Sequence, residues 1–103
     1  MGEVVYSRRA SKNIETIQAF YDKFDEVTSM KALRTIVFSL NKLSELPQVG
    51  RPVPGYEHLR ERTIAFGGQG FVVLYRIDAH LNRVYVLAIR HQREAGYGHE
   101  DVN

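Results

Sequence analysis

The stretch FVVLYRIDAHLNRVYVLAI, residues 71–89, contains two runs rich in β-branched and aromatic side chains, joined by the polar segment DAHLN (78–82). Runs of this kind favour β-strands, and a short polar segment between them predicts a turn. RTIAF (62–66) has the same character and precedes the turn-forming GGQG (67–70). The three runs therefore predict an antiparallel meander.

Two amphipathic helices are predicted before the meander. Ser7 can cap the first helix, which should end near Asp25. Thr28 or Ser29 is expected to begin the second, and Pro47 closes it because proline disfavours helix at and before its own position. The apolar faces are formed by Ile14, Ile17, Phe20, Tyr21 and Phe24 in the first helix, and by Met30, Leu33, Ile36, Val37, Leu40 and Leu43 in the second.

These elements predict an α+β fold. EVVY (3–6) is expected to form a short N-terminal strand, and the short connection between the helices makes them an antiparallel hairpin. The hairpin should pack on a mainly antiparallel four-stranded sheet. Residues 47–58, which hold all three prolines, are expected to form an ordered, turn-rich loop. The chain should be a single domain, 1–103, with residues 98–103 as a tail that need not be ordered.

Both faces of the predicted strands are apolar. Alternation places Tyr85, Leu87 and Ile89 on one face of the last strand and Val84, Val86 and Ala88 on the other. A sheet face of this kind is seldom left in contact with water. We therefore expect a partner protein, or the chain's own C-terminal tail, to cover the face away from the helices.

The bulk composition narrows the class of protein. The chain has 103 residues, no cysteine, a net charge of +2 and a pI near 9.0. Its apolar runs are far shorter than the roughly 20 residues that span a bilayer, so a membrane protein is not predicted. The absence of cysteine fits a reducing compartment, and we expect a cytoplasmic protein.

Motifs for cofactor, metal or nucleophilic chemistry are not apparent. GGQG (67–70) lacks the lysine and following helix of a phosphate-binding loop, and the four histidines are scattered. We therefore predict no cofactor and no metal. What remains is arginine near strand ends, where guanidinium groups can grip phosphate or carboxylate. The candidate residues are Arg60, Arg62, Arg76, Arg90, His91 and Arg93. They could form a catalytic centre, a docking surface or only solvated strand ends.

Four sequence segments resemble those of the RelE/ParE superfamily of toxins from bacterial toxin–antitoxin pairs. They are LSELPQVGRPVPG (43–55), LRERTIAF (59–66), FVVLYRI (71–77) and VLAIRHQREAGY (86–97). The order of strand, helical hairpin and meander is similar as well, so the resemblance extends over nearly the whole chain. It implies a type II toxin whose partner is a cognate antitoxin.

The superfamily has two functional branches. RelE-like members cleave messenger RNA in the ribosome with basic residues of the sheet, and by that resemblance His91, Arg93 and Tyr97 would be catalytic. ParE-like members bind DNA gyrase without known enzymatic activity. Val72 stands where the ribonucleases typically carry an arginine, and all four lysines precede Pro47 and so lie outside the meander. Because phosphoryl transfer needs preorganised cations, the ParE-like branch is favoured and no catalytic residue is predicted.

The resemblance also implies partners. The arginines and His91 would contact gyrase or its bound DNA, while the antitoxin would lay a helix or strand over the open sheet face and the hairpin. A homodimer or a larger toxin–antitoxin assembly is a further expectation, and so is the alternative of an inactive relic that only binds antitoxin. The antitoxin-binding residues predicted are Ile14, Ile17, Tyr21, Val72 and Leu74.

Overall fold

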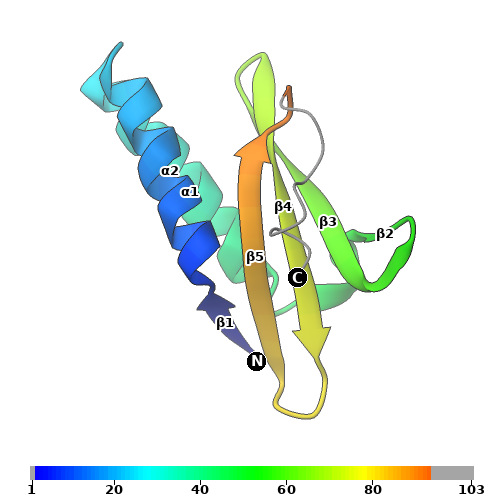
Figure 1. Cartoon of the computed structure of the whole chain (residues 1–103). Coiled ribbons are helices and arrows are strands. Elements are labelled where there is room, and N and C mark those ends of the chain that lie inside the picture. The colour runs from blue at the N-terminus through cyan, green and yellow to red at the C-terminus, as the bar shows by residue number, and fades with distance from the viewer. Residues whose placement is uncertain (1, 94–103) are drawn as a thin grey trace.

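A two-helix hairpin packed on one face of a five-stranded sheet makes up residues 2–93, the part of the chain that the computed structural model describes (Figure 1). In chain order the elements are β1 (Glu3–Tyr6), α1 (Arg8–Asp22), α2 (Glu26–Lys42), a 3-10 turn η1 (Pro47–Val49), β2 (Arg51–Val53), β3 (Tyr56–Phe66), β4 (Gln69–Asp78) and β5 (Arg83–His91). The α+β class and the helical hairpin are confirmed. The expected tail, 98–103, lies outside the described residues.

The sheet has the order β1-β5-β4-β3-β2. β3, β4 and β5 form the predicted antiparallel meander, while β1 pairs parallel to β5 from Glu3 beside Arg83 to Tyr6 beside Val86. The prediction of four strands was wrong by one. β2 lies within the proline-rich loop, where the Arg51 guanidinium contacts the Glu61 carboxylate of β3 at 2.6 Å and holds a three-residue strand against it.

The start of α2 also differs from the prediction. Asp25, rather than Thr28 or Ser29, is the N-cap: its carboxylate accepts hydrogen bonds from the Val27 N–H at 3.0 Å and the Thr28 hydroxyl at 2.7 Å. These hydrogen bonds hold the pKa of the Asp25 carboxyl below its usual value, and the bond from Thr28 has the larger effect. Ser29 is buried instead, and its hydroxyl donates to the Gln18 carbonyl of α1 at 3.3 Å. None of the helices within residues 2–93 is long and apolar enough to cross a membrane.

The main core lies between the hairpin and the sheet. Its buried side chains include Ile36 and Leu40 of α2 and Phe71, Val73 and Tyr75 of β4. A smaller cluster of Leu59, Leu74 and Ala88 lies on the other face of the sheet, here called the outer face.

A bulge in β5 changes which side chains share a face. Leu74 pairs with Ala88 and the next residue of β4, Tyr75, pairs with Val86, so Leu87 is a surplus residue. Beyond it the alternation is offset by one position. Ile89 therefore joins Val84 and Val86 in the main core, and the prediction that it shares a face with Tyr85 and Leu87 was wrong.

Ser7 connects α1 to the sheet. Its hydroxyl accepts a hydrogen bond from the Ala10 N–H at 3.0 Å and donates one to the Leu87 carbonyl of β5 at 3.0 Å. We expect Ser7→Ala to lower the free energy of unfolding by about 1–2 kcal/mol, because loss of the cap leaves a helix donor without its partner. Urea denaturation followed by circular dichroism measures this. Ser11→Ala, exposed on the same helix, is the control and should stay within about 0.5 kcal/mol of the parent.

Candidate functional site

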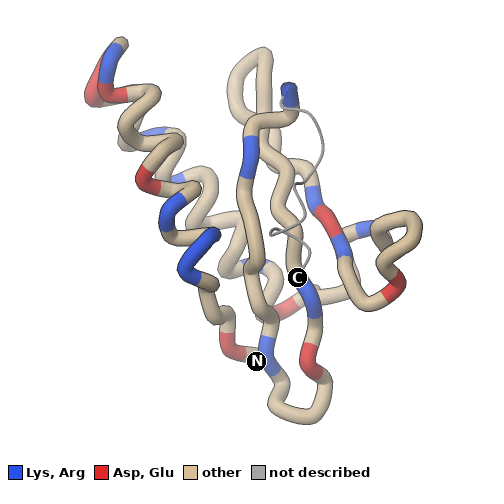
Figure 2. The backbone as a smooth tube through the Cα atoms, in the orientation of Figure 1, with Lys and Arg blue, Asp and Glu red and all other residues tan. Residues whose placement is uncertain are grey.

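The C-terminal end of β5, here called the tip (residues 90–93), carries Arg90, His91 and Arg93. The sheet extends to this point because the Gln92 N–H donates to the Gly70 carbonyl of β4 at 2.9 Å. Within the tip, the Arg90 guanidinium donates to the His91 carbonyl at 3.1 Å. Figure 2 shows basic residues at this end of β5 and others spread over the rest of the chain.

The tip side chains lie on both sides of the sheet. Arg90 is paired with Val72, which places it on the outer face, whereas His91 is paired with Phe71 of the main core. The His91 ring belongs to an aromatic cluster, with ring centroids 5.3 Å from Phe20, 5.8 Å from Tyr21 and 5.2 Å from Phe71. His91 therefore lies among aromatic rings, while Arg90 is half-buried and Arg93 is exposed.

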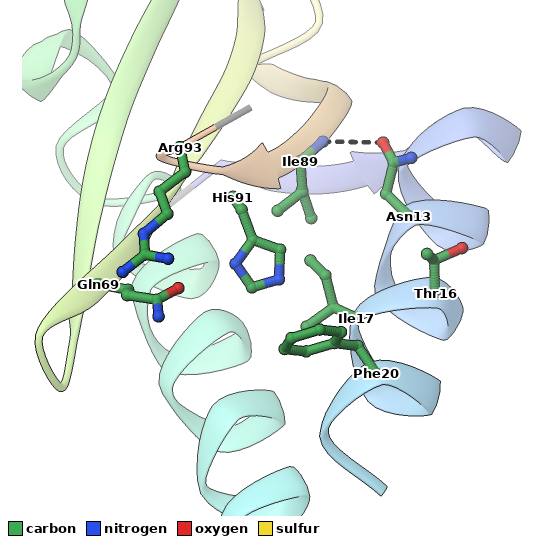
Figure 3. A pocket seen from close by; sticks show the side chains of 8 residues that line it. All are labelled: Asn13, Thr16, Ile17, Phe20, Gln69, Ile89, His91 and Arg93. Carbon is green, nitrogen blue, oxygen red and sulfur yellow. Dashed lines mark hydrogen bonds between the residues drawn. The ribbon is translucent and has the colours of Figure 1, made fainter. Parts of the chain in front are cut away.

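A pocket of about 410 Å³ lies beside the tip, between α1 and β5 (Figure 3). Ile17, Phe20 and Ile89 supply apolar walls. Polar side chains complete the lining, and they are Asn13, Thr16, Gln69, His91 and Arg93. This pocket could not be predicted from the sequence, because Asn13 and Thr16 look like ordinary polar positions on a helix.

Arg60 and Arg62 lie away from the tip, on the helix-facing side of β3, where they pair with Tyr75 and Val73. Arg60 donates to the Gly50 carbonyl at 2.6 Å and to the Gln48 carbonyl at 3.4 Å, so it holds the loop before β2. Burial raises the pKa of the Tyr75 hydroxyl, and the hydrogen bond from Gly50 and the two nearby arginines oppose that shift. Arg60 therefore stabilises the contact between β3 and the loop before β2.

Arg76 occupies a third location. It is on the outer face like Arg90, and its guanidinium carbon lies 4.1 Å from the centroid of the Tyr85 ring. Arg76 is four positions along β4 from Val72, the partner of Arg90, which corresponds to about 13 Å. The structure therefore places Arg90, His91 and Arg93 at one strand end but on two faces of the sheet, and it does not bring the six predicted residues into one group. Tyr97 lies outside the described residues.

The residues predicted to bind antitoxin are mostly internal. Leu74 is fully buried, Ile17 and Val72 are nearly so, and Ile14 and Tyr21 are partly buried against the main core. The large apolar side chains that do reach the surface of the hairpin are Phe20, Phe24, Val27, Met30, Val37 and Phe38. Four of these, Phe20, Phe24, Met30 and Val37, belong to the apolar faces expected from helical spacing. Ile36, Val37 and Phe38 are consecutive in one helix, so they cannot all face the core. This pattern was the signal in the sequence for an exposed apolar surface on the second helix.

Within residues 2–93, no three histidine, aspartate or glutamate side chains gather in a group that could hold a metal ion. All four lysines lie on the hairpin: Lys12 in α1, Lys23 at its C-cap, and Lys31 and Lys42 in α2. The described cations of the sheet are thus arginines.

The parallel β1, the helical hairpin and the antiparallel meander together define the fold of RelE/ParE-type toxins. Three solved structures share it. A chain of the chromosomal ParDE system of Pseudomonas aeruginosa is 21% identical, with a TM-score of 0.64 over 86% of this chain and 94% of that one. A chain of the RelBE2 complex of Mycobacterium tuberculosis is 22% identical, with a TM-score of 0.60 over 88% and 98%. A chain of the intact Escherichia coli RelBE complex is 13% identical, with a TM-score of 0.58 over 86% and 94%.

The family of ParE toxins of the type II toxin–antitoxin system parDE matches residues 4–96. The chain belongs to this family and is a toxin component of a type II toxin–antitoxin system. No curated protein sequence matches it.

Proposed function

We propose that the chain inhibits DNA gyrase by binding the enzyme or its bound DNA, and that a cognate antitoxin neutralises it. The observation that supports the first part best is the pair Arg90 and Arg93 at the tip, in a chain of the ParE family. Guanidinium groups form bidentate, charge-assisted hydrogen bonds with carboxylates and phosphates. Binding of this kind requires no covalent step by the toxin, and it would take place in the cytoplasm.

Docking is favoured over messenger RNA cleavage by the placement of the basic residues. His91, which would be catalytic in a RelE-like toxin, packs against three aromatic rings. Val72, next to Arg90 on the outer face, supplies no cation, and the lysines are on the hairpin. A phosphoryl-transfer site would need several cations directed at one phosphate.

The antitoxin surface is proposed on the exposed apolar side of α2. Val37 is 41% exposed and Phe38 65%, and both line a shallow groove of about 410 Å³ with Leu33, Arg34 and Asn41. An amphipathic helix would bury these side chains, and acidic residues on it would meet Arg34. The similar RelBE2 and RelBE chains come from toxin–antitoxin complexes, which agrees with a protein partner. A homodimer or a larger assembly stays a prediction.

A supercoiling assay with purified gyrase tests the proposed target. The double variant R90A/R93A should need at least a tenfold higher concentration for the same inhibition, since each charged hydrogen bond contributes about 1.5–3 kcal/mol. The control R8A/K12A removes two positive charges from exposed positions on α1, so it should inhibit like the parent.

Two results would contradict the proposal. One is equal inhibition by R90A/R93A and R8A/K12A, which would mean that inhibition depends on the net charge of the chain and not on the tip arginines. The other is codon-positioned cleavage of messenger RNA in a translation reaction, lost in His91→Ala, which would establish the RelE-like activity instead.

A further inference from the structure

Among residues 2–93, one edge of β5 has no neighbouring strand near the tip. On that side β1 pairs with β5 only as far as Val86, and the chain then turns into α1. The Gln92 N–H points to β4, so alternation directs the backbone groups of Ile89 and His91 away from β4, toward this edge. Within residues 2–93, no strand pairs with this part of the edge.

Side chains of α1 already satisfy part of the edge. The Ser7 hydroxyl donates to the Leu87 carbonyl at 3.0 Å, and the Asn13 side-chain carbonyl accepts from the Ile89 N–H at 2.9 Å (Figure 3). Asn13 therefore takes the place that a carbonyl oxygen of a neighbouring strand would occupy. The Ile89 carbonyl is the next group along the edge, and it is adjacent to the pocket that Ile89 itself lines.

The pocket is suited to one bulky apolar side chain with an acidic neighbour. Its volume of about 410 Å³ lies in the range of ligand sites, and Ile17, Phe20 and Ile89 form its apolar walls. Arg93 is exposed at its rim and supplies a positive charge. An aromatic or leucine side chain would occupy the apolar part, and a carboxylate next to it would pair with the guanidinium.

We propose that this edge and pocket bind an extended peptide segment, which donates a backbone hydrogen bond to the Ile89 carbonyl and places a bulky apolar side chain, flanked by an acidic residue, in the pocket. Strand addition of this kind obtains affinity from backbone hydrogen bonds and specificity from side-chain pockets. We assign the segment to the antitoxin, an assignment that rests on the proposed function. It would be a second contact, separate from the groove on α2.

The binding test uses the full-length chain labelled with ¹⁵N and ¹³C-methyl groups and synthetic nine-residue peptides of alternating valine and threonine. The first peptide has a central phenylalanine followed by aspartate. We expect it to shift the amide signals of Ile89 and Asn13 and the methyl signals of Ile17 and Ile89. A peptide with alanine in the centre, or with lysine in place of aspartate, should bind at least tenfold more weakly.

Matched variants locate the binding site. Thr16 is exposed and lines the pocket, so Thr16→Trp should fill the entrance and weaken binding of the phenylalanine peptide at least tenfold. Gln18→Trp introduces the same ring at an exposed position of α1 that does not line the pocket, and it should bind the peptide like the parent. In cells, Thr16→Trp should arrest growth as the parent does but be rescued less by the co-expressed antitoxin.

The outcomes separate this inference from the proposed function. If Thr16→Trp and the parent bound the peptide with equal affinity, the peptide would not occupy the pocket, and this inference would be wrong whatever the gyrase assay shows. The same shifts with a nine-nucleotide thymidine oligomer, and none with the peptides, would make the site one for nucleic acid and overturn the peptide. Peptide binding at these residues without gyrase inhibition would leave the pocket standing and remove the gyrase target.

Discussion

Gly50→Ala is expected to lower the free energy of unfolding by about 2–4 kcal/mol, because the backbone at Gly50 passes directly over Tyr75. A methyl group at this position would lie 2.7 Å from the Glu61 carbonyl oxygen and would collide with the Tyr75 hydroxyl. That hydroxyl is fully buried, accepts from the Gly50 N–H at 2.8 Å and donates to the Pro47 carbonyl at 2.7 Å. The substitution therefore adds a steric clash and displaces the Tyr75 hydroxyl from both hydrogen bonds.

Urea denaturation of the purified chain measures the effect of Gly50→Ala. The midpoint should fall while the dependence of the free energy on urea stays the same. Gly68→Ala is the control, since a methyl group there meets nothing within 4 Å, and it should change stability by less than about 0.5 kcal/mol. If both variants lost the same stability, the close approach to Tyr75 would not be the cause.

Phe71→Ala is expected to have the largest effect, about 3–5 kcal/mol, because it empties a fully buried position in the aromatic cluster. The Phe71 ring stacks on Phe66 with centroids 5.7 Å apart and contacts the His91 ring. Many domains of this size have only 5–15 kcal/mol in total, so a loss of this size would leave little stability at 37 °C.

Phe71→Leu and Phe24→Ala complete this experiment. The leucine variant retains most of the volume and should fold, yet the ¹H chemical shifts of the His91 ring should change because a neighbouring aromatic ring is gone. Phe24 is 72% exposed, so Phe24→Ala should stay within about 0.5 kcal/mol of the parent. A similar loss for Phe24→Ala and Phe71→Ala would contradict the placement of the core.

The sequence predicted the meander and the hairpin because these elements follow local rules. The runs around Tyr75 and Val86 contain the β-branched and aromatic residues that strands favour, and Ser7 is the N-cap expected from a serine just before a helix. β2 could not be predicted in the same way. Its residues, Arg51–Val53, include a proline, and they form a strand through pairing with β3, a contact that is distant in sequence.

The candidate site depended on register, which the sequence did not provide. Arg60 and Arg90 are both arginines near strand ends, yet one donates to the Gly50 carbonyl beside the core and the other lies on the outer face of the tip. The pocket beside the tip was not predicted because Asn13 and Ile89 come from opposite ends of the chain. Only the packing of α1 along β5 brings the Asn13 Oδ1 atom within 2.9 Å of the Ile89 backbone nitrogen.

The extra residue in β5 determines the orientation of the tip. In a strand that alternated without interruption from Val84 onward, Arg90 would point into the hairpin and His91 to the outer face. Accommodation of Leu87 as a bulge reverses both. Deleting Leu87 would accordingly shorten the chain by one residue and still leave His91 toward the helices and Arg90 on the opposite face. Leu87 is therefore the position where β5 can lose a residue without exchanging the faces of the tip side chains.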